Sequence, residues 1–420
     1  MDALPTEILT DILSRLPVNS VCCIRSVSKA LLKTVDDVSF PALHMRRRLF
    51  DNVPQVPRLV LLSRSCSFYQ RMHPLKYDGN DLLTRSKIVS ELESPQCSYT
   101  HDFVFCNLFG FTSLNTENGR SCLLVNPFKR EFLMLPTTSD LQVYSFCHDT
   151  YGMGFDIMTN TYKIVRVSRY HVSRYQKEVV AAEVLVLGTS SWRELPSAPP
   201  CYPSCNVGAC RHALEVSCYP SCNYVATSTH GEMHWLVRED DKSVHILSFD
   251  FKNEEFYWTP HPLALKKKTN LSFFFHLLNF RGSLALVDVS SLDIEIWVLG
   301  LKNYDDKKKR EWVLKYKIDM KQHPLCFGSH EPWHFKFGEW EQGIFFHEEN
   351  YLGRRSIFFM DLTCMSIKSV LIKYRQDSTV YSCTDSMISL KNYGDLVEVE
   401  EQRYSTFIFE NEAITSYEDD

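Results

Sequence analysis

The chain has 420 residues, a formal net charge of −5, and a composition that is 44% hydrophobic and 13% aromatic. This length suits a small domain plus a large one, and the apolar content is too high for an intrinsically disordered chain. The sequence lacks both an apolar run of the ~18 residues that span a bilayer and the concentrated basic face of a nucleic-acid-binding protein, so we expect no membrane and no nucleic-acid partner.

The first residues do not follow the pattern of a secretory signal peptide, because Asp2 and Glu7 stand where a basic region would be. We therefore expect the protein in the cytoplasm, the nucleus or both, where thiols are kept reduced. The 15 cysteines are accordingly interpreted as small hydrophobic residues and not as disulfide partners.

Residues 4–17, LPTEILTDILSRLP, predict a short amphipathic helix between two Leu-Pro dipeptides. Pro5 is expected as the first helical residue, where its missing N–H costs nothing, and Pro17 should end the helix. The apolar residues recur at helical spacing and form one broad stripe; they are Ile8, Leu9, Ile12, Leu13 and Leu16.

Three further short helices are predicted up to residue 50. The expected caps are Asn19 or Ser20 for the second helix, Ser26 or Ser28 for the third, and Ser39 for a fourth that covers Phe40 to Phe50. A bundle of this size is marginal by itself, and it has more apolar residues than its own core needs. Either a partner protein or the rest of the chain must cover the excess.

The segment LPTEILTDILSRLPVNSVCCIRSVSKALLKTVDDVSFPALHMRR resembles the F-box. It departs from the family at Leu31, where a Trp is common, and at the run Cys22-Cys23-Ile24, where a Leu is common. The resemblance implies docking on the SKP adaptor of a cullin-RING ubiquitin ligase. The adaptor-binding residues that it implies are Leu4, Pro5, Ile8, Leu9, Ile12, Leu13, Leu16, Pro17, Val18, Ile24, Val27 and Leu31.

After residue 55 the pattern changes to short apolar or alternating runs separated by turn residues, which predicts strands. A recurring unit consists of an apolar strand, a turn rich in Asn, Asp, Gly or Thr, and a second strand with an early aromatic residue. Examples occupy residues 121–136, 152–167, 183–196, 245–260, 294–318 and 356–372, with further hairpins at 225–237 and 277–289.

These units start at irregular intervals, so the repeat is degenerate. A long series of hairpins must protect its sheet edges, and a closed ring of blades does so for about 350 residues. A β-sandwich would leave much of this region unexplained. We therefore predict a mainly β protein with a small helical head and a propeller-like domain of about five to seven blades.

Several segments resemble, in order, the F-box-associated domain of plant F-box proteins, a kelch-like domain that captures the protein to be ubiquitinated. The segments are NPFKREFLMLP, YGMGFDIMTNTYKIVRV, SSWRELP, GEMHWLV and SFDFKNEEF. Self-incompatibility-locus F-box proteins share this layout. The resulting domain boundaries are residues 1–50 for the F-box, 51–95 for a linker and the start of the β domain, 96–410 for the F-box-associated domain, and 411–420 for an acidic tail.

Residues 201–223, CYPSCNVGACRHALEVSCYPSCN, contain five cysteines and a histidine. The pairs Cys201/Cys205 and Cys218/Cys222 have three intervening residues, a spacing that zinc sites tolerate. The Tyr-Pro inside each pair favours turns, however, and the repeated CYPSCN also fits a local duplication in a surface loop. We expect no metal and no cofactor, and the zinc alternative stays open.

The sequence contains no nucleophile elbow, HExxH motif or phosphate-binding loop. Gly152-Met153-Gly154 lacks the third glycine of a dinucleotide site and is interpreted as strand or turn. The basic run Lys307 to Arg310 follows two aspartates and is interpreted as a solvated loop. Trp235 and Trp297 are interpreted as blade core, so the tryptophans identify no target-binding residue.

Together these features predict a non-catalytic substrate-recognition subunit of an SKP–cullin–F-box ubiquitin ligase. The helical head would bind the adaptor, and the β domain would hold an unknown protein substrate. The alternatives are a non-degradative F-box/kelch-like scaffold, whose head either binds the adaptor without a cullin or packs internally, and a propeller enzyme.

Overall fold

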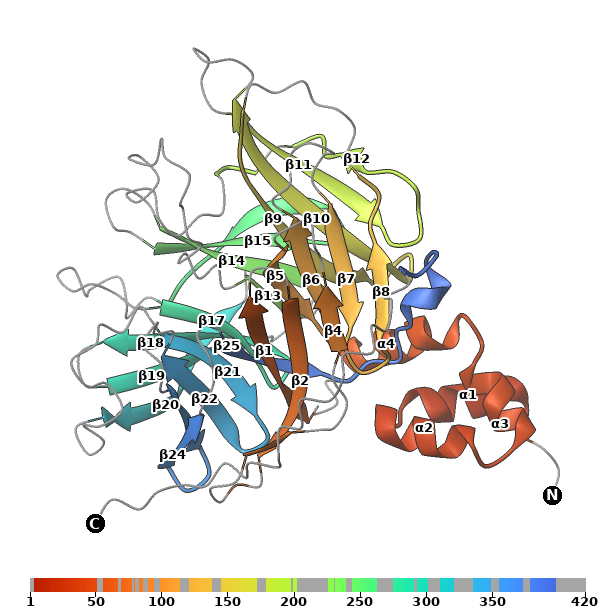
Figure 1. Ribbon diagram of the computed structural model, residues 1–420, viewed down its shortest axis with the longest axis horizontal. Coiled ribbons are helices and arrows are strands. Elements are labelled where there is room, and N and C mark those ends of the chain that lie inside the picture. Colours follow the sequence, from red (N-terminus) through yellow and green to blue (C-terminus); the bar gives the residue numbers. More distant parts are fainter. Residues whose placement is uncertain are drawn as a thin grey trace.

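The computed structural model describes residues 4–50, 56–66, 69–77, 79, 83–85, 90–93, 99–113, 121–137, 145–171, 179–197, 199–201, 226–229, 231–238, 244–262, 275–290, 293–300, 310–320, 335–348, 355–372 and 378–397. Within them, four helices precede six antiparallel sheets that form the blades of a propeller (Figure 1). This confirms the mainly β fold with a helical head, and six blades fall within the predicted range.

The helical head comprises α1 (Thr6–Ser14), α2 (Val18–Arg25), α3 (Lys29–Val35) and α4 (Phe40–Phe50). Of the two caps proposed for the third helix, Ser28 is the one used, since its hydroxyl accepts the Leu31 N–H at 3.2 Å. The fourth helix has the predicted bounds.

The two prolines of the head have a different role from the one predicted. Pro5 and Pro17 are N-caps and not helical residues, with ψ angles of 141° and 147°. Their carbonyls accept the first helical hydrogen bonds, from Leu9 and Val21 at 3.0 Å each. The prediction that Asn19 or Ser20 caps the second helix is therefore wrong, because the ladder already begins at the Pro17 carbonyl.

Each blade is a meander of at least four strands, and we number the blades along the chain. Blade 1 consists of β25 (Ser378–Thr384), β1 (Pro57–Cys66), β2 (Tyr69–Tyr77), β3 (Leu83–Arg85) and β4 (Ser90–Glu93), and blade 2 of β5 (Tyr99–Phe105), β6 (Leu108–Ser113), β7 (Cys122–Asn126) and β8 (Glu131–Met134). Blade 3 consists of β9 (Ser145–Asp156), β10 (Thr161–His171), β11 (Val179–Val186) and β12 (Arg193–Glu194), and blade 4 of β13 (Ala226–Thr229), β14 (Glu232–Arg238), β15 (Val244–Asp250) and β16 (Glu255–Thr259). Blade 5 consists of β17 (Phe275–Phe280), β18 (Ser283–Ser290), β19 (Asp293–Gly300) and β20 (Glu311–Asp319), and blade 6 of β21 (Phe335–Trp340), β22 (Gly343–Glu348), β23 (Arg355–Asp361) and β24 (Ser366–Ile372).

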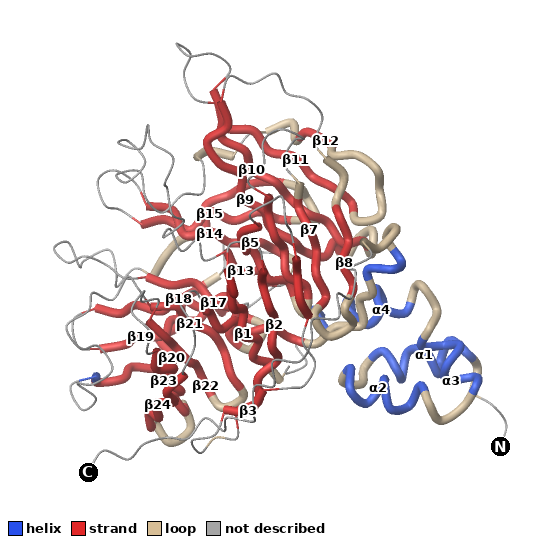
Figure 2. Tube along the Cα trace, viewed as in Figure 1, coloured by secondary structure: helices blue, strands red, loops and turns tan. Residues whose placement is uncertain are grey.

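The last strand among the described residues closes the ring. Strand β25 pairs along its whole length with β1, in the register Leu61↔Val380, and it also contacts β5 and β21 of the neighbouring blades. Blade 1 thus takes its first strand from the C-terminal part of the chain and its other strands from the N-terminal part. This pairing covers the edge of β1 that β2 does not, in line with the edge argument. Figure 2 shows the helices of the head gathered at one side of the strands of the propeller.

The recurring sequence unit corresponds to a recurring turn. In the β9–β10 turn, one carboxylate oxygen of Asp156 accepts the N–H groups of Met158 and Thr159, at 2.8 and 3.4 Å. The residue before the second strand, Asn160, has a positive φ of 55°. The same arrangement recurs at Asn126, Asp250 and Asp361. The side chain supplies the bonds that the tight turn leaves unmade.

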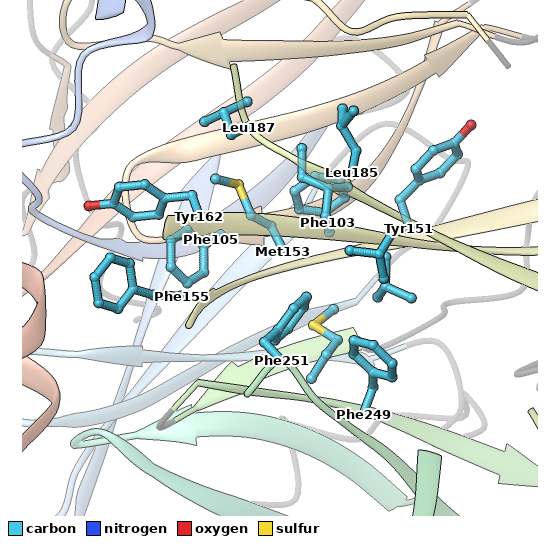
Figure 3. Packing of buried hydrophobic residues seen from close by; sticks show 14 of the residues in the cluster. Phe103, Phe105, Tyr151, Met153, Phe155, Tyr162, Leu185, Leu187, Phe249 and Phe251 are labelled. Carbon is cyan, nitrogen blue, oxygen red and sulfur yellow. The ribbon is translucent and has the colours of Figure 1, made fainter. Parts of the chain in front are cut away.

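The core lies between the blades. Side chains of blades 2, 3 and 4 converge in one cluster, which includes Tyr151, Phe155 and Phe251 (Figure 3). Gly154 allows this approach, since a Cβ there would lie 2.1 Å from the Phe251 ring. The segment Gly152-Met153-Gly154 is therefore part of strand β9, which confirms its interpretation as strand or turn.

Candidate functional site: the exposed face of the helical head

The head has a small core of its own. Its buried residues are Leu13, Val21, Val35 and Phe40, and its half-buried ones are Leu9, Leu16, Ile24 and Leu31. These residues come from all four helices and from the turn between α1 and α2, so one core fixes the orientation of each helix. Leu16 belongs to this core and not to an outward stripe, because α1 ends at Ser14 and the chain then turns inward.

A second set of apolar residues of the head points to solvent. The exposed fractions are 55% for Leu4, just before α1, and 49% for Ile8 and 44% for Ile12 on α1. Val27, in the turn before α3, is 73% exposed. Pro5 and Pro17 are also exposed, and Val18 is half-buried. Each exposed Leu or Ile forgoes about 1.5–3 kcal/mol that burial would provide, so this face is suited to a partner.

The twelve predicted adaptor-binding residues thus divide into two groups. The outward group consists of Leu4, Pro5, Ile8, Ile12, Pro17 and Val27, and the inward or half-buried group of Leu9, Leu13, Leu16, Val18, Ile24 and Leu31. The first group is available to a partner, whereas the second supports the helices that present it. The sequence pattern does not separate the groups, because both follow the same apolar spacing.

A pocket of about 470 Å³ lies at the α2–α3 turn, beside Val27. It is lined by Cys22, Arg25, Ser26, Val27, Ser28, Lys29 and Leu32. Leu32, which is 39% exposed, extends the apolar face. Leu32 is not among the predicted adaptor-binding residues. Its position four residues after Ser28, the cap of α3, places it one turn into the helix and is the sequence feature that could have identified it.

Ion pairs hold the helices around this face. Arg25 of α2 donates two hydrogen bonds to the Asp36 carboxylate after α3, at 2.5 and 2.8 Å. The hydrogen bond from Arg25 lowers the pKa of Asp36, although both groups are exposed. Asp11 of α1 accepts hydrogen bonds from Arg15 and from Arg47 of α4. The apolar face is therefore presented by helices that are connected at their polar sides.

In the propeller, two tryptophan interpretations are confirmed. Trp235 is 1% exposed and Trp297 packs against a buried cluster. Trp258, by contrast, is 42% exposed on the outer strand of blade 4. Trp333 lies outside the described residues. The described tryptophans belong to blade 4 (Trp235, Trp258), blade 5 (Trp297, Trp312), blade 6 (Trp340) and the turn before β12 (Trp192).

The interpretation of residues 307–310 as a solvated loop is wrong for Arg310. Its guanidinium is buried and bonds both oxygens of Glu232, at 2.7 and 2.9 Å, and also the Tyr257 hydroxyl at 3.0 Å. Blade 5 is thereby joined to blade 4. The pairing holds the pKa of Glu232 below its usual value despite burial. Lys307 to Lys309 lie outside the described residues.

Within the described residues, no group of three or more His, Cys, Asp or Glu side chains could hold a metal ion. The cysteine-rich segment lies outside them from residue 202 onward, with only Cys201 described. Nor, among the residues described, is any helix long and apolar enough to cross a lipid bilayer.

The sequence matches the F-box domain over residues 1–43 and the F-box associated beta propeller domain over residues 66–397. The chain belongs to the F-box-associated propeller family. In this F-box protein the first match covers α1 to α3 and the start of α4, and the second covers the six blades apart from β1, which ends at Cys66 where that match begins.

Relatives from Arabidopsis thaliana are named as F-box proteins. F-box/kelch-repeat protein At4g19930 is 23% identical over 350 residues, which cover 75% of this chain and 69% of that protein. F-box protein At3g07870 is 25% identical over 356 residues, which cover 76% and 73%. These plant relatives agree with the resemblance in the sequence.

Solved structures with some likeness are distant. TolB from Acinetobacter baumannii has a TM-score of 0.38 at 9% identity, over 85% of this chain and 73% of that one. The periplasmic gluconolactonase PpgL from Pseudomonas aeruginosa has a TM-score of 0.38 at 11% identity, over 78% and 99%.

Proposed function

We propose that this F-box protein is the substrate-recognition subunit of an SKP–cullin–F-box ubiquitin ligase. The observation that carries the proposal is that the outward apolar residues Leu4, Ile8, Ile12 and Val27 remain exposed although the core of the head is filled. A head that only needed to fold would not keep these residues at the surface. An F-box domain implies an SKP-type adaptor as the partner that covers them.

The proposed mechanism is proximity. The adaptor connects the head to a cullin-RING scaffold, and the propeller holds a protein substrate near the charged ubiquitin-conjugating enzyme. Tethering raises the effective concentration of the reacting groups and orients them. The chain itself would contribute binding and geometry without a catalytic step. We place this activity in the cytoplasm, the nucleus or both.

The test uses the purified full-length chain and an SKP-type adaptor. The double variant Ile8→Ala/Ile12→Ala removes two exposed side chains that the core does not use, so the protein should keep its thermal unfolding midpoint. Adaptor affinity, measured by calorimetry, should fall at least 100-fold, since roughly 3 kcal/mol or more of apolar burial is lost.

The matched control is Val38→Ala, which shortens a side chain of the same head that is 73% exposed but lies outside the predicted adaptor-binding set. It should leave the affinity unchanged. If the double variant bound the adaptor as tightly as the unaltered chain, the assignment of the face would be refuted. Adaptor binding without co-purification of a cullin would instead favour the non-degradative scaffold.

A further inference from the structure

The chain continues beyond the strand that closes the ring. Residues 385–397, here called the strap, follow β25, and they contain the short 3₁₀ helix η6 (Leu390–Asn392). The strap passes between α4 and the outer strand of blade 2, β8 (Figure 1). Near its end, the Val397 N–H donates to the Phe132 carbonyl of β8 at 2.8 Å.

Blade 2 holds the strap by hydrogen bonds with buried groups. The Glu131 carboxylate, 3% exposed, accepts the Ser389 hydroxyl and the Leu390 N–H, each at 2.7 Å. Asn126 donates to the Ile388 carbonyl at 3.4 Å. Ile388 and Leu390 have no measurable exposure and belong to the largest propeller core. The strap is therefore an integral part of the propeller.

The head is attached to the start of the strap. Arg48 of α4 donates to the Thr384 hydroxyl at 2.5 Å and to the Asp385 carbonyl. Burial lowers the pKa of Arg48, and the Asp385 carboxylate acts in the opposite direction. On its other side, Asp385 lies 2.9 Å from Arg58 of β1, which also donates to Asn19 of α2 at 3.0 Å.

The two units also exchange apolar side chains. Met387 of the strap packs against the core of the head. In return Met45 of α4, 2% exposed, belongs to the propeller core that contains Ile388 and Leu390. Separating the head from the propeller would thus expose both methionines and leave Arg48 without its acceptors. The contact has the character of a domain core and not of a flexible linker.

We propose that the strap fixes the orientation of the head relative to the propeller, with Arg48 and Met387 as positioning residues. This inference rests on the proposed function in one respect: a fixed orientation sets the direction in which the propeller presents a captured protein to the ligase. Rigid tethering restricts the positions that a captured target reaches, whereas a flexible attachment of the head would widen that range.

The test measures the orientation directly on the full-length chain. Spin labels carried by unnatural amino acids at the exposed positions Lys33 of α3 and Ser190 of blade 3 report the head–propeller distance by pulsed electron resonance. The unaltered chain should give one narrow distance distribution. The double variant Arg48→Ala/Met387→Ala should broaden it at least twofold, while adaptor affinity stays within twofold.

The matched control is Arg46→Ala, which removes an exposed guanidinium from the same helix and should leave the distance distribution narrow.

If the double variant lowers the unfolding midpoint of the propeller, Lys129→Ala replaces it. This change removes the hydrogen bonds that Lys129 donates to the Met387 and Ile388 carbonyls at 3.3 and 2.9 Å. A narrow distribution in the variant that remains folded would overturn the proposal.

A second readout separates this proposal from the proposed function. In a reconstituted ligase, self-ubiquitination of the propeller should be confined to a few lysines in the unaltered chain and should reach more lysines in the double variant. An absence of ubiquitination in every variant would count against the ligase role alone, because the distance distributions are obtained without a ligase.

Discussion

The head and the propeller use apolar residues in opposite ways. Most of the large apolar side chains described in the propeller are buried, among them Trp235 at 1% exposure. The core of the head itself buries only Leu13, Val21, Val35 and Phe40, since Met45 of α4 belongs to the propeller core, and the head exposes Leu4, Ile8 and Ile12 by nearly half or more. In the part of the chain that the structure describes, the propeller thus covers its apolar side chains by packing between blades, whereas the head leaves several uncovered and uses Met387 of the strap to complete its core.

Charged groups follow the same division. In the propeller, Lys163 lies between Asp156 and Glu254, each at 2.8 Å and all with low exposure. In the head, the Arg25–Asp36 pair has about half of each side chain exposed. Exposed pairs contribute little to stability, whereas losing one partner of a buried pair costs several kcal/mol. We therefore expect a mutation in a buried ion pair of the propeller to lower the free energy of unfolding more than a mutation in an exposed pair of the head.

The largest effect should come from Trp235→Ala, which removes a buried ring from the interface of blades 3 and 4. Loss of a buried aromatic side chain costs about 3–5 kcal/mol, and the free energy of unfolding should fall by that amount in a urea titration. The control Trp258→Ala removes the same side chain from an exposed position. Equal losses in the two variants would contradict the described blade packing.

The next largest effect should follow Glu232→Gln, which leaves the buried Arg310 guanidinium without a carboxylate. We expect a loss of about 3 kcal/mol in the free energy of unfolding. The double variant Glu232→Leu/Arg310→Met removes both charges and should recover much of the loss. A single and a double variant of equal stability would show that the charges are not coupled.

A smaller effect, confined to binding, should follow Ile12→Ala in the head. The free energy of unfolding should change by less than about 0.5 kcal/mol, as for other exposed positions, whereas the adaptor dissociation constant should rise about tenfold or more. Leu13→Ala is the contrasting variant, since Leu13 is buried in the core of the head and should mainly affect stability. If Ile12→Ala mainly lowered stability and Leu13→Ala mainly weakened adaptor binding, the assignment of the inward and outward residues would be wrong.

The last prediction concerns the pH dependence of stability. Burial raises the pKa of Asp102 to about 7 from its ordinary value of 3.8. Between these values the folded chain keeps a proton that the unfolded chain has lost, so this group makes the protein less stable as the pH rises through that window. Asp102→Asn should flatten this part of the profile in thermal melts from pH 4 to pH 8, and an unchanged slope would exclude the contribution of Asp102.

Features of the fold that depend on neighbouring residues were predictable from the sequence, whereas contacts between residues far apart in the chain were not. Hairpins such as 121–136 and 356–372 were predicted because alternation and an Asn or Asp turn lie within sixteen or so residues. The pairing of Arg310 with Glu232 joins residues 78 positions apart, and no pattern near Arg310 distinguishes it from the lysines before it. The strap was not predicted either, because its contacts with α4 and blade 2 also join residues that are far apart in the sequence.

For the site, the residue set was predictable but its two faces were not. Apolar spacing placed Ile8, Ile12 and Leu16 on one stripe, whereas the cap at Pro5 and the end of α1 at Ser14 turn Leu16 inward. These ends depend on φ and ψ at single residues, which composition does not determine. The adaptor-binding assignment of the set stays a prediction.

The attachment of Arg48 to Thr384 and Asp385 has a consequence for biosynthesis. The partners are separated by 336 and 337 residues, which take roughly 20 to 70 s to synthesise at about 5–20 residues per second. During that interval the newly made head waits on the ribosome without Met387 and without its place on the propeller. The apolar face of the head is then open to chaperones or to a free adaptor before the ring closes.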